Sequence, residues 1–248
     1  MRLAVIVLLL SIASAARAEL PLVMEVRAST ATYHENPARL DTLRAELVET
    51  ARTDPNVDSL LALAHISFAW GDIRATTREA KLDAYEQGRQ AAKRAVELDP
   101  RSVLAHFWYG TNTARWGQTK GIARSLFLLP TVKQEIDTVL TLDPTFAPGY
   151  ALAGNVYYEV PPLLGGDLDR AEQMFRKGLA LAPRFTAMRL GLAKTLIRKG
   201  RLDEAQKELQ AVLDEKAPDN LADWTMKDSR RARELLESIR GKSSASAG

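Results

Sequence analysis

The sequence contains no cysteine among its 248 residues, and this absence excludes several kinds of chemistry. Without thiols the chain forms no disulfide, no thiolate nucleophile and no Cys-ligated zinc site, and it has no lipid-modified N-terminal cysteine. Neither sign of charge is in large excess, since 34 Lys and Arg stand against 31 Asp and Glu. A formal balance of +3 leaves no electrostatic footprint for nucleic acid, and we expect no such partner.

Aromatic residues are also scarce, at 6% of the chain, but hydrophobic residues as a class reach 46%. This composition excludes wholesale disorder and allows a globular core. The length of 248 residues corresponds to one large domain or two small ones.

The first 18 residues have the features of a secretory signal peptide. A basic start precedes an unbroken apolar run over residues 3–10, and Ala16 and Ala18 supply the small residues that signal peptidase requires. The run is shorter than the roughly 18 apolar residues of a membrane span, so we expect cleavage after Ala18. No later stretch is apolar enough to cross a bilayer. The mature chain is therefore predicted to be an exported protein of the periplasm.

Short proline breaks divide the rest of the chain at regular intervals. Helix-period apolar patterns fill nearly all of residues 36–239, and strand-like alternation is scarce. Proline disfavours helix in the residue before it and is accepted in the first turn of a helix, so each break ends one helix and begins the next. A spacing of 45, 44, 39 and 35 residues predicts a solenoid of helix pairs. The prolines of the five breaks are Pro55, Pro100, Pro144, Pro183 and Pro218.

Fixed offsets from these prolines select small and apolar residues. The positions five, eight and twelve before a proline, and ten and thirteen after it, form one stripe on each helix. Small residues in such a stripe allow two helices to cross closely, so we expect the stripe to be buried. Its members are Gly88, Ala92, Ala95, Gly110, Thr113, Val132, Ile136, Val139, Gly154, Tyr157, Ala171, Phe175, Gly178, Ala193 and Leu196 and, in the last unit, which is one residue longer before Pro218, Ala205, Leu209 and Val212.

Residues 150–157, followed by Ala171, Phe175 and Pro183, resemble the small, aromatic and proline pattern of the tetratricopeptide repeat family. Residues 192–209 resemble it again at nearly the standard length. The resemblance implies an all-α, tetratricopeptide-like helix-pair solenoid over residues 57–217. Its four pairs would occupy residues 57–100, 101–144, 145–183 and 184–217.

The first two pairs carry extra residues between their helices, at about 72–85 and 118–132. We expect these to be inserted segments that pack over a face or close a pocket. An N-terminal segment with one helix would occupy residues 19–56. Residues 218–241 predict a C-terminal capping helix, because their apolar stripe suits a cover for the last repeat. Residues 242–248 are small and polar, which is typical of a disordered tail.

A narrower resemblance lies in the third pair. Residues 157–167, which read YYEVPPLLGGD, are similar to the linker of the TRAP-transporter-associated helical proteins, the TatT component family. The resemblance implies an envelope protein that partners a periplasmic solute-binding protein, handles an apolar small molecule and associates into homo-oligomers. The regulator-of-microtubule-dynamics proteins of eukaryotes share a similar organisation, but the signal peptide argues against that context.

The same linker has a local physical interpretation. Two prolines end the preceding helix, two glycines permit a sharp reversal, and Asp167 can cap the next helix. One interpretation is that the segment is only a shaped turn. The other is that Leu163 and Leu164 gate or line a binding site, since exposed apolar residues often mark contacts.

Motifs for catalysis and cofactor binding are missing. The three histidines, His34, His65 and His106, have no neighbouring acid in an H-E-x-x-H spacing, so we expect packed histidines and no metal site. Residues 117–121 lack the order of a phosphate-binding loop, and no Gly-x-Ser-x-Gly elbow occurs. The sequence therefore predicts no enzyme, no catalytic residue and no cofactor.

The first helices of stacked pairs line the concave face of such a solenoid. Offsets of 4, 7, 11 and 14 residues after each proline give a mostly apolar face, to which the first pair would contribute Ser59, Ala62, Ile66 and Ala69. An apolar face with few polar groups is typical of a small-ligand site, although inserted segments could instead fill it. The predicted ligand- or partner-binding residues are Phe107, Asn155, Tyr158, Leu163, Leu164 and Lys194.

Two function classes follow from these features. The first is a non-enzymatic periplasmic binding or adaptor protein, accessory to a TRAP transporter, which binds an apolar ligand or a solute-binding partner. The alternative is an envelope scaffold for protein–protein assembly.

Overall fold

The computed structural model describes residues 20–245, and these residues form helices and loops without a strand. The predicted all-α fold is confirmed. The predicted signal peptide, residues 1–18, lies outside the described residues. The elements in chain order are α1 (Pro21–Ala31), α2 (Arg39–Thr53), α3 (Val57–Ile73), α4 (Arg78–Leu98), α5 (Val103–Lys120), α6 (Ile122–Leu142), α7 (Ala147–Glu159), the 3₁₀ turn η1 (Pro162–Leu164), α8 (Leu168–Leu181), α9 (Thr186–Arg198), α10 (Leu202–Asp214), α11 (Leu221–Asp223), the π-helical η2 (Trp224–Asp228) and α12 (Ser229–Ala245).

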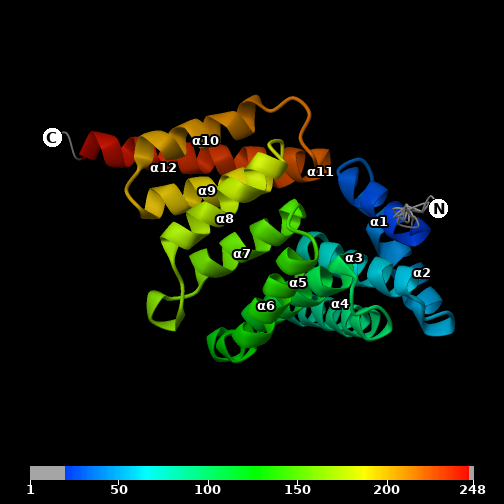
Figure 1. The fold of residues 1–248 in the computed structure, drawn as a ribbon. Coiled ribbons are helices and arrows are strands. Elements are labelled where there is room, and N and C mark those ends of the chain that lie inside the picture. The colour runs from blue at the N-terminus through cyan, green and yellow to red at the C-terminus, as the bar shows by residue number, and fades with distance from the viewer. Residues whose placement is uncertain (1–19, 246–248) are drawn as a thin grey trace, which may run out of the picture.

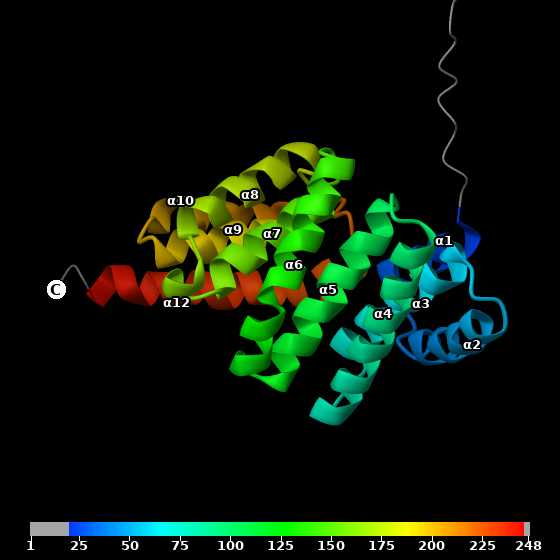
Figure 2. The same cartoon turned by 60° about the horizontal axis from the view of Figure 1, so that its bottom comes forward.

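Consecutive helices pack against one another from one end of the molecule to the other (Figure 1). In Figure 2, α1 and α2 lie at one end and α12 lies at the other, alongside α10. α12 covers the last pair with Ala232, Leu236 and Ile239, all buried, as expected of a cap. It continues to Ala245, into the range predicted as a tail. Between residues 20 and 245, no helix combines the length and the apolarity of a bilayer-crossing segment.

The Asp-Pro breaks end and begin helices through local hydrogen bonds. The carboxylate of Asp99, which follows α4, accepts a hydrogen bond of 3.1 Å from the backbone N–H two residues later. The Ser102 hydroxyl then accepts the N–H of Ala105 at 3.3 Å and caps α5. The Asp143 carboxylate, which follows α6, accepts the equivalent hydrogen bond from the backbone N–H of Thr145 at 2.9 Å. Because each break satisfies its own backbone groups, its position can be predicted from the local sequence.

The stripe chosen by the proline offsets is buried, with the single exception of Tyr157, which is half-buried. Its centre is Phe175 of α8, whose ring lies between Gly154 of α7 and Gly191 of α9. A Cβ atom at either glycine would stand 2.6 Å from this ring. Glycine therefore lets three helices meet around one aromatic side chain.

The extra residues predicted between the helices of the first two pairs lengthen those helices, and several residues of the stretch 118–132 line a cavity. α3 runs to Ile73 and α4 begins at Arg78, so a short loop joins them. Only Gly121, with φ of +121°, separates α5 from α6. Neither α3 nor α5 contains a residue that ends the helix before its loop. Both helices therefore continue beyond the length that is usual in a repeat. The first two pairs are consequently long hairpins.

Residues 20–56 form two helices, α1 and α2, where the sequence predicted one. The N-terminus of α1 has no side-chain cap of its own. Instead, the carboxylate of Asp58, in α3, accepts the backbone N–H groups of Leu22 and Val23, each at 3.0 Å. α1 then packs on α3 through the buried Val26. The stabilising contacts come from residues distant in sequence, so the local pattern did not reveal this helix.

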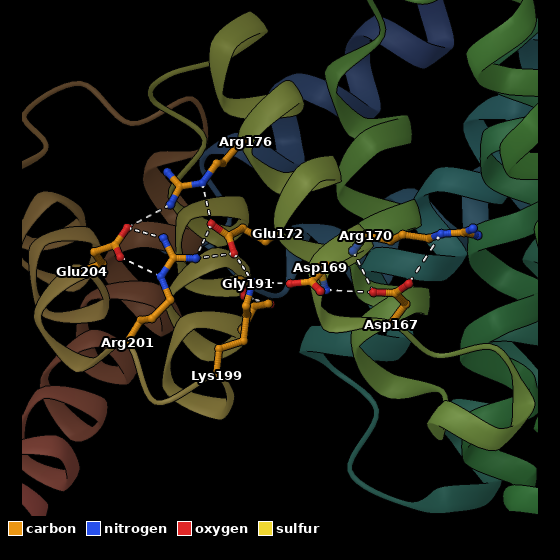
Figure 3. A network of polar contacts seen from close by, with 10 residues as sticks. Asp167, Asp169, Arg170, Glu172, Arg176, Gly191, Lys199, Arg201 and Glu204 are labelled. Carbon is orange, nitrogen blue, oxygen red and sulfur yellow. Dashed lines mark hydrogen bonds and ion pairs between the residues drawn. The ribbon is translucent and has the colours of Figure 1, made fainter.

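An ion-pair network joins the third pair to the fourth (Figure 3). The Glu172 carboxylate accepts hydrogen bonds from Lys199 at 2.6 Å, Arg201 at 2.7 Å and Arg176 at 2.9 Å. Burial opposes ionisation of Glu172, but these three cations lower its pKa to about 2. Glu204 extends the network by accepting from Arg201 at 2.6 Å. A single carboxylate thus ties α8 to the turn between α9 and α10.

Candidate functional site

A cavity of about 430 Å³ lies on the inner side of the solenoid, where the first helices of the pairs face one another. Segments from both ends of the chain reach it, because α1 and the α11–η2 segment close one side. Its lining residues are Val23, Arg27, His65, Phe68, Asp72, Leu104, Phe107, Trp108, Thr111, Phe146, Pro148, Ala151, Leu152, Asn155, Phe185, Ala187, Asp223 and Lys227. We call this cavity the inner groove.

Aromatic rings form much of the groove wall. Trp108 stacks on the His65 ring, with centroids 4.3 Å apart and planes at 20°. Phe107 meets Phe146 edge to face at 5.2 Å, and Phe68 lies 5.5 Å from Trp108. Rings locked against one another present a rigid apolar surface, which loses little conformational entropy when a ligand binds.

The two histidines of the first helices do not form a metal pair. Burial lowers the pKa of His65 to about 3, helped by the charge of Arg27, so its imidazole is neutral at pH 7. His106 faces elsewhere, and its ring nitrogens lie 2.6 Å from a Glu135 carboxylate oxygen and 3.0 Å from the Pro100 carbonyl. Within residues 20–245, no group of His, Asp and Glu side chains is arranged to hold a metal ion.

Three polar groups on the groove wall are available to a ligand. The Thr111 hydroxyl is buried and has no hydrogen-bond partner within the described chain. Asn155, on α7, is exposed, and residues 20–245 offer its side-chain amide no hydrogen-bond partner. Arg27, on α1, is exposed at the edge of the groove and forms no ion pair in the same part of the chain. An unpartnered buried hydroxyl is costly unless water or a ligand binds it, so Thr111 offers a ligand in the groove a hydrogen-bonding group.

A set of charged contacts, the latch, closes the groove between the two ends of the solenoid. Tyr33, just after α1, donates a hydrogen bond of 3.0 Å to Asp223 of α11. Lys227 of η2 lies 2.7 Å from Asp223 and 3.4 Å from Asp72 of α3. Asp72 also pairs with Arg115 of α5. Burial and the Asp223 charge raise the pKa of Tyr33, so the phenol stays a donor. The latch converts an open groove into a partly enclosed one.

The carboxyl group of Asp228, beside the latch, is buried, and burial disfavours its charged form. Burial raises its pKa from 3.8 to about 6, and the Asp223 charge adds to the rise, while the Thr186 hydroxyl, 2.7 Å away, and Lys227 oppose it. The fold therefore favours the protonated acid, and the contribution of Asp228 to stability falls as the pH rises from about 4 to about 6.

An Asp228→Asn variant should therefore be more stable than the wild type above pH 6. The amide keeps an acceptor for Thr186 but has no charge to bury. We expect the free energy of unfolding to rise by about 3 kcal/mol at pH 7.5 and to change little at pH 4, since one pKa unit corresponds to about 1.4 kcal/mol. Urea unfolding at both pH values measures this. The same change at the exposed Asp137 should have no pH-dependent effect, and an equal gain there would contradict the assignment.

The six residues predicted for the site separate into three places. Phe107 and Asn155 line the inner groove. Tyr158 and Lys194 lie next to each other outside its lining, where Lys194 is 5.1 Å and Arg198 3.8 Å from the Tyr158 ring. Leu163 and Leu164 lie on η1, and the Leu163 side chain is 98% exposed. The structure does not bring these leucines to the groove.

The sequence also misplaced the contribution of the first pair. Ser59, Ala62, Ile66 and Ala69 are all buried in the core, and α3 lines the groove through other residues. α3 begins two residues after its proline, whereas α5 and α7 begin three residues after theirs. One residue rotates a helix face by about 100°, so a fixed offset selects the wrong face there.

Sequence reasoning missed several aromatic residues of the groove wall and every residue of the latch. Phe146 and Phe185 had a signal, because each stands two residues after a break proline. That repetition places both at the start of a first helix, next to the groove. Asp72, Asp223 and Lys227 carried no such signal, since their pairing depends on how the two ends of the solenoid meet.

Two family patterns match this chain. The family described as Regulator of microtubule dynamics protein 1-3 matches residues 26–163, and a tetratricopeptide repeat family matches residues 163–224. No curated protein matches.

Solved structures with the same helical arrangement include TTC0263, a tetratricopeptide repeat protein of Thermus thermophilus. It is 23% identical, with a TM-score of 0.64, over 88% of this chain and 97% of that one. At this identity the likeness shows the fold alone, a tetratricopeptide-like solenoid. MamA is 19% identical, with a TM-score of 0.48 over 75% of this chain and 93% of that one.

Proposed function

Because this chain belongs to the regulator of microtubule dynamics protein 1-3 family and continues into a tetratricopeptide repeat, we propose that it is a non-enzymatic binding protein whose inner groove holds an apolar ligand. The observation that carries the proposal is the inner groove itself. A partly enclosed, aromatic-lined space with a few polar groups is the usual form of a small-ligand site.

The geometry favours a small molecule over an extended peptide. A peptide that runs along a solenoid needs a groove open at both ends, and the latch between Tyr33, Asp223 and Asp72 closes one side here. The polar groups Thr111 and Asn155 would orient a head group, while the rings receive an apolar tail. We therefore propose a ligand with one polar end, such as a fatty acid.

A Phe107→Ser variant should bind such a ligand at least tenfold more weakly, because it removes an apolar wall of the groove. The probe is cis-parinaric acid, a fluorescent fatty acid, titrated into protein stripped of extracted lipid. Phe127→Ser is the matched control, since Phe127 is an exposed phenylalanine outside the groove lining. Equal affinity of both variants and the wild type would contradict the proposal. A melting curve of each variant verifies that it is folded.

The location and the partner are further parts of the proposal. The family description refers to microtubule dynamics, and we propose that this activity does not carry over, because residues 1–18 predict export to the periplasm. The linker at residues 157–167 supports an accessory role with a TRAP solute-binding protein. Cell fractionation tests the location, and a pull-down from periplasm tests the partner. Capture of envelope-assembly proteins in place of a solute-binding protein would favour a scaffold.

A further inference from the structure

Apolar side chains are exposed together at one edge of the molecule, away from the latch. The turn between α5 and α6 and the linker η1 both project at the lower left in Figure 1. Ile122 is 79% and Phe127 73% exposed at the start of α6, and Leu163 and Leu164 are exposed on η1. We call these four residues and their two elements the apolar edge.

A second cavity shows that the two elements are neighbours. It measures about 310 Å³ and is lined by Ile122 and Leu126 from α6 and by Val160 and Pro161 from the chain leading into η1. The lining contains one carboxylate, Glu159. Ile122 of the apolar edge therefore opens onto a mostly apolar space, which the chain leading into η1 also lines.

Residues 126–129 of α6 place apolar side chains on every side of the helix. Leu126 and Leu129 face the second cavity, Leu128 packs near Gly117 of α5, and Phe127 faces outward. A helix that is apolar all round is normally buried, but this one is covered on only part of its surface. An uncovered apolar surface of this kind marks a contact with something outside the chain.

The charge of the edge indicates what that contact is. Residues 118–134 contain Lys120, Arg124 and Lys133 and no Asp or Glu. The Arg124 guanidinium lies 5.8 Å from the Trp116 ring and 5.5 Å from the Phe127 ring, and it forms no ion pair within residues 20–245. Free cations beside exposed apolar and aromatic side chains form the pattern of a surface that binds anionic lipid.

We propose that the apolar edge docks on an anionic membrane surface. Ile122 and Phe127 enter the acyl region next to the head groups, while Lys120 and Arg124 contact lipid phosphates. The apolar residues stand on two projecting elements, which suits insertion into a bilayer better than packing on a folded protein. The edge shares no residue with the inner groove lining, so membrane docking and ligand binding can fail independently.

Vesicle co-sedimentation of the full mature chain tests this inference. With vesicles of phosphatidylcholine and phosphatidylglycerol at 3:1, we expect binding that weakens as salt rises. An Ile122→Ser, Phe127→Ser double variant should bind at least tenfold more weakly, and Arg124→Glu should lose most of the preference for anionic over pure phosphatidylcholine vesicles. A melting curve confirms that each variant folds, since all three side chains are exposed.

A matched control is available at the opposite side of the molecule. Leu221 and Met226, in α11 and η2, are 46% and 49% exposed, so a Leu221→Ser, Met226→Ser double variant removes two exposed apolar side chains elsewhere. This control should bind vesicles as the wild type does. Failure of the wild type to sediment with anionic vesicles, or equal loss in the control, would overturn the proposal. Binding to a soluble protein without vesicle binding would overturn it too.

Discussion

A Gly154→Val variant is expected to lose about 3 kcal/mol of unfolding free energy, because overpacking a buried site forces side chains and backbone apart. Even a bare Cβ at position 154 would stand 2.6 Å from Cε1 of Phe175. The ring has little room to move, since the backbone of Gly191 also approaches it closely and Phe175 is 1% exposed. For a chain of this size, the loss corresponds to a decrease in melting temperature of about 10 °C.

Thermal unfolding monitored by circular dichroism measures this effect. Asn155→Val is the matched control, because it places the same side chain on the same helix at the next, exposed position. Its melting temperature should lie within about 2 °C of the wild type, as is usual for surface substitutions. Adding Phe175→Leu to Gly154→Val should recover part of the loss by making room. If Gly154→Val had the same melting temperature as the wild type, the proposed close packing of α7, α8 and α9 would be wrong.

A Glu172→Gln variant is expected to lose about 2–3 kcal/mol at pH 7, which is the second large effect. Three cations, Lys199, Arg201 and Arg176, donate to this one carboxylate (Figure 3). Hydrogen bonds to charged groups contribute about 1.5–3 kcal/mol each, and the neutral amide leaves the cations without their common partner. Part of the loss is offset because the cations remain partly accessible to water.

The pH dependence of this effect has a definite sign. The pKa of Glu172 is lowered from 4.5 to about 2 in the folded protein, so its contribution is complete above pH 4.5 and is lost as the pH falls toward 2. Urea unfolding at pH 7 and pH 3 should therefore give a larger difference between wild type and Glu172→Gln at pH 7. Glu208→Gln removes a carboxylate with one partner, Arg189, and should lose about 1 kcal/mol or less. Equal losses in the two variants would contradict the network.

The helix boundaries could be read from the sequence because their causes are local. Each Asp-Pro break satisfies its own backbone groups, as Asp99 and Ser102 do, so the break is complete within a few residues. The buried stripe could be read for a related reason, since a helix of fixed period carries residues at set offsets to the same face. This rule failed where α3 began one residue early after Pro55. The same fixed offsets predicted Phe107 and Asn155, and these two residues do line the inner groove.

Only the tertiary structure decided how the groove is completed and what lies outside it. The Tyr33–Asp223 hydrogen bond joins residues 190 positions apart, and the cap of α1 comes from Asp58 in another helix. Such contacts depend on the angles between successive helix pairs, which accumulate along the solenoid and are set by packing at every interface. The same angles place η1 beside the α5–α6 turn and leave Leu163 exposed far from the groove. Local sequence determines the helices and their buried faces, whereas the meeting of distant helices follows from the sum of many packing contacts.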